Sequence, residues 1–209
     1  LFISNFVYQD LYFNFGDRNY LKRKSYSFDE YHQSENQLIP IVAKYCKENN
    51  LEFGICAKSN IFDNEATKIE HDYYKSLISI DLKWSFFPSE NTIKTFNLID
   101  EFSAIIFIDS YLGYEAMARK KPVAAITIRD EAFKVESGRN FGFPEKLMNQ
   151  GLFWTNSFDI NHIVKIMDFV TNVSQNDWEK AYKEYHGKVA GYDFNNKQLF
   201  DLINKKINK

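Results

Sequence analysis

A small group of ligand-binding residue types follows the most apolar short stretch of the chain. Residues 104–108 (AIIFI) predict a buried strand, and Ser110 then stands where a helix starting at Tyr111 would begin. The Ser110 oxygen can accept a hydrogen bond from a backbone N–H of the first helical turn. Gly113 lacks a side chain, which would let a ligand approach the backbone closely. This strand-to-helix junction is therefore a candidate anion site, because the first N–H groups of a helix attract negative charge.

Glu115 stands in the same first turns, beside Tyr114. Its carboxylate can accept two hydrogen bonds from a vicinal diol such as a ribose, while the helix N-terminus meets a phosphate or a carboxylate. A simpler explanation is also open, since an acidic residue early in a helix interacts favourably with the helix dipole by ~0.3–1 kcal/mol. Gly113 could likewise serve only the packing of the helix on the strand. Local physics alone leaves both explanations standing.

Further polar residues follow the next predicted strand, 123–128. Arg129 comes directly after it, and Arg139 and Asn140 stand beside Gly138 in a segment, 129–145, that predicts a long polar loop. A guanidinium group there could bind a diphosphate or a sugar carboxylate in a bidentate manner. The alternative is that these arginines are solvated loop residues.

A second long loop is predicted at 9–27, where Asp17 and Arg18 follow the first predicted strand. Asp17 is the candidate for a catalytic general base, with a salt bridge to Arg18 as the alternative. The four histidines have no metal-ligand spacing, so no metal site is predicted. The chain also has no Gly-x-Ser-x-Gly elbow, no Walker loop and no Gly-x-Gly-x-x-Gly fingerprint. A Ser-His-Asp hydrolase, a P-loop NTPase and an ordinary NAD enzyme are therefore disfavoured.

Strands that alternate with helices must position these residues. The predicted strands are short apolar stretches at 1–7, 51–57, 83–87, 104–109, 123–128 and 152–155. The predicted helices have apolar residues at helical spacing, at 28–49, 65–77, 92–101, 111–120, 160–172, 175–185 and 195–207. Pro40 inside the first helix predicts a kink or a late start there. The stretches 104–108 and 123–126 are expected at the centre of the sheet.

This alternation predicts an α/β fold, a Rossmann-like three-layer αβα arrangement with a mostly parallel sheet of about six strands. Residues 1–209 are expected to form one nucleotide-sugar-binding domain, in which 156–209 is a helical C-terminal extension. In open parallel sheets, ligands bind outside the carboxyl ends of the strands. The candidate residues named above are expected at that edge.

Composition limits the classes of function. The 209 residues are 44% hydrophobic and 17% aromatic, which is enough for a large core, and 26 basic against 28 acidic residues give a net charge of −2. Bulk charge therefore does not favour nucleic acid or an anionic membrane as partner. Cys46 and Cys56 have no metal or redox spacing and are expected to be reduced packing residues. With no transmembrane run and no signal peptide, the protein is expected in the cytoplasm, with peripheral membrane association at most.

The stretch 108–126, IDSYLGYEAMARKKPVAAI, resembles the donor-binding domain of GT-B glycosyltransferases. The resemblance rests on a strand, a serine, Gly-Tyr-Glu-Ala and then Lys-Pro-Val. It is closest to bacterial enzymes of capsule and lipopolysaccharide assembly, and more distant to the glycerophosphotransferases of teichoic acid synthesis. It implies that Ser110, Gly113, Tyr114 and Glu115 contact a nucleotide-activated sugar. Lys120 departs from the small residue usual there, and a His-Pro pair of some related enzymes is absent.

The resemblance implies a glycosyltransferase of surface-polysaccharide synthesis, in which a nucleotide-sugar is the donor substrate and a carbohydrate is the acceptor. No tightly bound cofactor and no essential metal are expected. Because the chain starts at Leu1 on a predicted strand, we expect it to be the C-terminal half of a two-domain enzyme, beside an N-terminal lobe or partner domain. Three alternatives remain: a non-catalytic binding module with a degenerate transferase fold, a nucleotide-sugar epimerase and a glycerophosphotransferase relative.

Overall fold

The computed structural model describes residues 1–7, 27–79, 81–133, 140–142, 147–185, 189 and 197–207. Most of the predicted 9–27 loop, including Asp17 and Arg18, lies outside the described residues, as do Gly138 and Arg139. Asn140 is described and is exposed.

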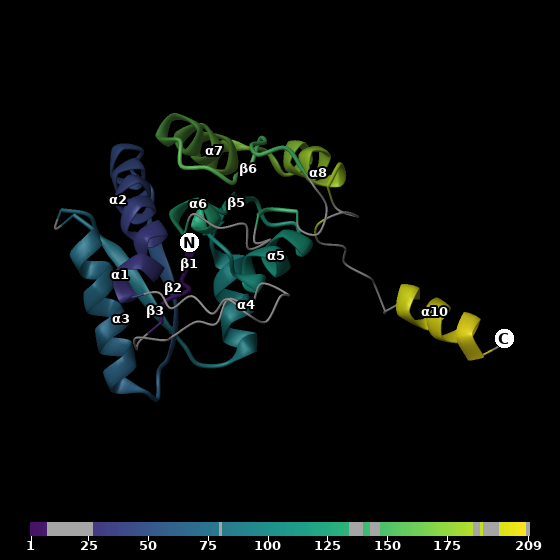
Figure 1. Cartoon of the computed structure of the whole chain (residues 1–209), viewed down its shortest axis with the longest axis horizontal. Coiled ribbons are helices and arrows are strands. Elements are labelled where there is room, and N and C mark those ends of the chain that lie inside the picture. Colours follow the sequence, from purple (N-terminus) through teal and green to yellow (C-terminus); the bar gives the residue numbers. More distant parts are fainter. Residues whose placement is uncertain are drawn as a thin grey trace.

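Six parallel strands form one sheet (Figure 1), as the alternation of strands and helices predicts. The strands are β1 (Phe2–Ile3), β2 (Phe53–Asn60), β3 (Trp84–Ser89), β4 (Ile105–Phe107), β5 (Val123–Ile126) and β6 (Trp154–Thr155). Their order across the sheet is β3-β2-β1-β4-β5-β6. This is the strand order of a doubly wound Rossmann fold, so the predicted α/β class is confirmed. The centre of the sheet is the β1–β4 pair, whereas the sequence predicted β4 and β5 there.

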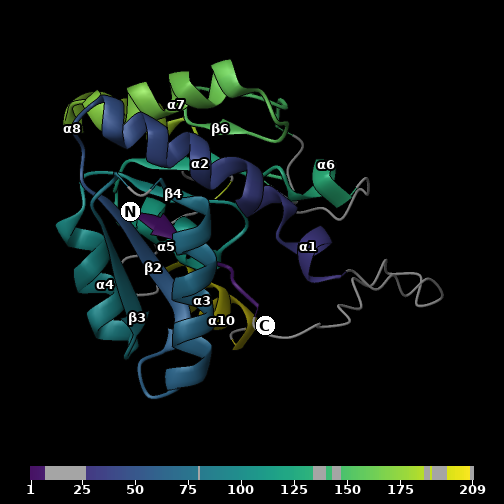
Figure 2. The same ribbon diagram turned by 90° about the vertical axis from the view of Figure 1, so that its left-hand side faces the viewer.

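Helices cover both faces of the sheet (Figure 2). The described helices are α1 (Phe28–Tyr31), α2 (Gln33–Glu48), α3 (Asn64–Leu77), α4 (Thr92–Glu101), α5 (Tyr111–Ala118), α6 (Arg129–Phe133), α7 (Ile160–Asn172), α8 (Gln175–Lys183) and α10 (Lys197–Ile207). Helix α2 packs between α3 and α7 on one face, and α4 and α5 pack against β3, β4 and β5 on the other. Helix α7 contacts β5 and β6, so it is part of the layer over the sheet.

Two predicted elements differ from the structure. The helix predicted at 28–49 is broken at His32, and α2 continues through Pro40, which is exposed on the helix surface. A capping box at Ser27 and Glu30 starts the short α1, and the break follows one turn later. The predicted polar loop after β5 instead begins with helix α6, in which Arg129 and Phe133 are buried.

The core lies between the sheet and its helices. All four residues of β5 and all three of β4 are buried, as expected for strands covered on both faces. Cys46 and Cys56 are buried and free, which confirms their prediction as packing residues. The described side chains of helix α10, at 200, 201 and 203–207, are exposed, and the helix stands apart from the sheet in Figure 1. Among the described residues, no helix is long and apolar enough to cross a membrane.

Candidate functional site

A cavity of about 610 Å³ opens at the carboxyl ends of β1 and β4. Its described lining is mostly polar or aromatic: Asn5, Tyr31, Lys58, Asp109, Ser110, Tyr111, Leu112, Tyr114, Asn140 and Val189. In the order β3-β2-β1-β4-β5-β6, the chain leaves β1 and β4 toward opposite faces of the sheet. The loops therefore diverge at this point and leave a crevice, which is where open α/β sheets bind ligands. We call it the switch-point cavity.

Helix α5 presents its N-terminus to the switch-point cavity. Ser110 is at the N-cap position, as predicted, but within the described residues its side chain makes no capping hydrogen bond. Five other helices do have a capping side chain, from Ser27, Asp63, Asn91, Asp159 and Ser174. Among the described residues, the first N–H groups of α5 thus have no side-chain cap, and the Ser110 hydroxyl lies at the cavity surface.

Tyr114 forms part of the cavity wall one turn along α5. Its ring stacks on Phe141, with centroids 5.9 Å apart, and meets Phe107 edge-on. Burial raises the pKa of the Tyr114 hydroxyl to about 12, so the group stays protonated and can donate a hydrogen bond. Tyr111 lines the mouth and is 88% exposed, which offers an aromatic face to a ligand.

Arg129 lies behind the cavity and is engaged by the protein itself. It donates from Nε to Asp109 Oδ2 at 2.8 Å, from Nη2 to Glu35 Oε1 at 2.7 Å and from Nη1 to the Tyr31 carbonyl oxygen. Its side chain is 1% exposed, and the guanidinium carbon lies 4.4 Å from the centre of the Tyr31 ring. Burial opposes its charge, but the carboxylates of Glu35 and Asp109 outweigh burial and raise the pKa of Arg129. The Arg129 guanidinium thus links α1, α2 and the turn after β4, which together form this wall of the cavity.

The same wall continues through Asn5 and Glu35. Asn5 Nδ2 donates to Asp109 Oδ1, so the turn after β1 is tied to the turn after β4. Burial raises the pKa of Glu35 in spite of its pairing with Arg129. Its second oxygen, Oε2, is buried without a hydrogen-bond partner among the described residues. Two carboxylates thus share one guanidinium, and this wall supplies no net positive charge to the cavity.

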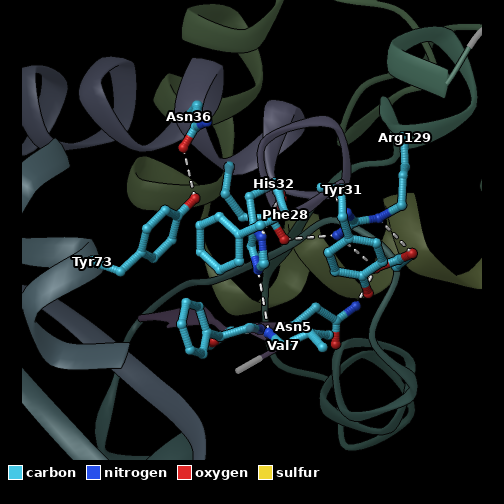
Figure 3. Close-up of polar contacts among 12 residues, drawn as sticks. Asn5, Val7, Phe28, Tyr31, His32, Asn36, Tyr73 and Arg129 are labelled. Carbon is cyan, nitrogen blue, oxygen red and sulfur yellow. Dashed lines mark hydrogen bonds and ion pairs between the residues drawn. The ribbon is translucent and has the colours of Figure 1, made fainter. Parts of the chain in front are cut away.

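His32 fixes the position of the wall at the α1–α2 break (Figure 3). Its Nε2 accepts the backbone N–H of Val7 at 3.2 Å, and its Nδ1 lies 2.9 Å from the Phe28 carbonyl oxygen. These partners require a neutral ring that carries its proton on Nδ1. Burial lowers the pKa of His32 to about 4, consistent with that state. His32 thereby joins the segment after β1 to α1, which carries Tyr31.

The predicted site residues separate into groups. Ser110, Tyr114 and Asn140 come together around the cavity. Gly113 is buried under them, where an added Cβ would lie 2.2 Å from the Phe107 ring, so the close packing of α5 on β4 requires a glycine. Glu115 is exposed on α5 and is not part of the described lining. Asp17 and Arg139 lie outside the described residues, and their assignments stay predictions.

The sequence analysis did not select Asn5, Tyr31, Lys58 or Tyr111, although all four line the cavity. A signal existed for Lys58, which directly follows the predicted strand 51–57 and so belongs to the carboxyl edge of the sheet. Tyr31 carried no such signal, because it lies on a helix that reaches the cavity only through tertiary packing.

Comparison with known proteins adds one finding. No curated protein and no solved structure matches the chain. One protein family does, over residues 1–207, and its description is "putative O-antigen biosynthesis protein". The match covers nearly the whole chain and agrees with the predicted role in surface-carbohydrate synthesis. The chain belongs to this O-antigen biosynthesis family.

Proposed function

We propose that the switch-point cavity binds a nucleotide-activated sugar, and that the chain is the donor-binding part of a GT-B-like glycosyltransferase of surface-polysaccharide synthesis. One observation carries the proposal: the cavity lies at the switch point of a Rossmann-type sheet, against a helix N-terminus that no side chain of the described residues caps. Such a terminus favours phosphate oxygens. The family match supports the pathway class, and the resemblance over 108–126 supports the type of donor.

Each part of the cavity wall has a role in this proposal. The Ser110 hydroxyl and the first amides of α5 bind the phosphate that becomes the leaving group. In the transfer, the bond from the anomeric carbon to the phosphate oxygen breaks, and negative charge grows on that oxygen. Fixed N–H donors stabilise this charge without reorganisation. Tyr111 offers an exposed ring for stacking, while Tyr114 and Asn140 offer hydrogen bonds to the base or the sugar.

The ribose contact of Glu115 remains part of the proposal in a narrower form. Its carboxylate lies on the outer side of α5, away from the described lining. It can therefore act only on a part of the ligand that extends past the cavity. The acceptor and the general base are expected on a second lobe, as the resemblance implies.

Isothermal titration with a panel of CMP-, CDP-, UDP- and GDP-linked sugars tests the proposal. The decisive variant is Ser110→Leu, which adds bulk at the cavity surface and removes no capping bond. We expect one nucleotide class to bind the parent chain and to bind this variant at least ~10-fold more weakly, since a buried polar contact is lost. Ser79→Leu, at an exposed position outside the lining, is the matched control. No binding by any nucleotide-sugar, or equal binding by Ser110→Leu, contradicts the proposal.

A further inference from the structure

We propose that Lys58 is the phosphate-binding cation of the switch-point cavity and that Glu70 is its positioning residue. The inference rests on the proposed function and deepens it, because it assigns the charge that faces a diphosphate. Lys58 lines the cavity and its side chain is exposed there. It forms no ion pair with any residue that the structure describes. Among the described residues, its ammonium group is therefore free to meet an anion.

Charge within the cavity points to the same residue. The charged side chains of the described lining are Lys58 and Asp109. Asp109 is held by Arg129, which Glu35 also engages, so the positive charge of Arg129 is already balanced by carboxylates. A diphosphate in this cavity thus needs a cation from elsewhere, and among the described lining residues Lys58 supplies it.

The backbone pairing around Lys58 is irregular. The pairing of β2 with β3 changes register between Cys56 and Asn60, and Lys58 lies inside that interval. The five residues of β2 before Lys58 are buried, and Lys58 is the first exposed one. Irregularities of this kind commonly reorient a side chain next to a binding site.

Glu70 holds the irregular stretch in place from α3. It is fully buried, and its carboxylate accepts the backbone N–H of Lys58 at 3.0 Å and that of Ser59 at 2.7 Å. It also accepts a hydrogen bond from the Ser4 hydroxyl, which in turn accepts one from the Tyr74 hydroxyl at 2.8 Å. Glu70 thereby satisfies two N–H groups at the irregularity and links them to the turn after β1. Because Glu70 is fully buried and is not among the described lining residues, we assign it a positioning role.

Three ligands separate charge recognition from base recognition: a nucleoside diphosphate of the class that binds best, its nucleoside, and inorganic pyrophosphate. In titrations of the full chain, Lys58→Met should weaken the nucleoside diphosphate and pyrophosphate about tenfold or more, since a charge-assisted hydrogen bond is lost. The nucleoside should be unaffected. Lys58→Arg should restore most of the affinity, and Lys58→Met should flatten the salt dependence. Lys68→Met removes an equal charge from an exposed position outside the lining and serves as control.

Glu70→Gln tests the positioning role. It should weaken the diphosphate and spare the nucleoside, and it should add little when combined with Lys58→Met. A loss that also affects the nucleoside, or that persists in the Lys58→Met background, contradicts positioning through Lys58.

If Lys58→Met binds the nucleoside diphosphate and pyrophosphate as tightly as the parent chain does, the assignment of Lys58 is wrong. The proposed function still stands in that case, provided that the parent chain binds a nucleotide. If pyrophosphate binds and depends on Lys58 but no nucleotide binds better, the assignment holds and the proposed function is wrong. If neither ligand binds the parent chain, both are wrong.

Discussion

The two walls of the switch-point cavity use similar residue types in opposite ways. On the wall formed by α5, the Ser110 hydroxyl makes no capping hydrogen bond, so the first amides of the helix have no side-chain cap among the described residues. On the opposite wall, formed by α1, α2 and α6, Arg129 donates hydrogen bonds to Asp109, Glu35 and the Tyr31 carbonyl oxygen. Polar side chains at the carboxyl edge of a sheet therefore do not identify a binding surface by themselves. What matters is whether their donors are already used by the protein.

The largest effect is expected from the removal of Arg129. Arg129→Met should lower the free energy of unfolding by about 3–5 kcal/mol, because Glu35 and Asp109 would lose their shared counter-charge in a buried site. Urea denaturation measures the change. Arg119→Met is the matched control, since Arg119 pairs with Asp100 on the surface, and it should cost about 1 kcal/mol or less. Equal effects of the two variants would show that Arg129 is not a structural residue and could face a ligand.

A second test concerns the neutral His32 of the same wall. Its pKa is lowered to about 4 in the folded protein, against about 6.5 in an unfolded chain. The unfolded state therefore binds the extra proton between these values. The stabilisation is complete above about pH 6.5 and is lost as the pH falls toward 4, by about 2–3 kcal/mol.

Urea unfolding between pH 7 and pH 4.5 measures the contribution of His32. His32→Gln should make stability less steep across this range than in the parent chain. His71→Gln, at a histidine whose side chain is 41% exposed, is the matched control. A parent-like slope in His32→Gln would mean that His32 is not the titrating group.

The smallest effect is expected for Glu115 on helix α5. Glu115→Ala should weaken nucleotide-sugar binding by about twofold or less, because the side chain is exposed and lies outside the described lining. Titration beside Ser110→Leu gives the comparison within one helix. A loss of tenfold or more would instead show that the ribose contact of Glu115 is a major part of donor binding.

Much of the fold could be predicted because its signals are local. All six strands were located from apolar runs, and the helices α4 and α7 were predicted with the bounds that the structure shows. The break at His32 could not be predicted, because it depends on a hydrogen bond between the His32 side chain and Val7, which lies 25 residues earlier in the chain. Pro40 gave a misleading signal, since α2 accommodates it on an exposed face.

The candidate site could be predicted only in part. Ser110 and Tyr114 follow β4 directly, so a strand-to-helix junction was enough to place them at the edge of the sheet. Arg129 was predicted as a ligand-binding loop residue, and its buried partner Glu35 lies 94 residues earlier in the chain. Lys58 was missed although it follows the predicted strand 51–57, because a position at a strand end does not show which cavity the residue lines, and that depends on the order of the strands.

The sequence by itself determined the alternation of strands and helices, and with it a parallel α/β sheet and the O-antigen biosynthesis family. The alternation and the type of sheet follow from hydrophobic periodicity, which neighbouring residues specify, and the family follows from a match over residues 1–207. Only the tertiary structure decided that β1 lies beside β4, that Lys58 faces the cavity and that Arg129 does not. Those outcomes depend on strand order, on burial and on ion pairs between distant segments, because a charged group becomes available or engaged only when the partners around it are in place.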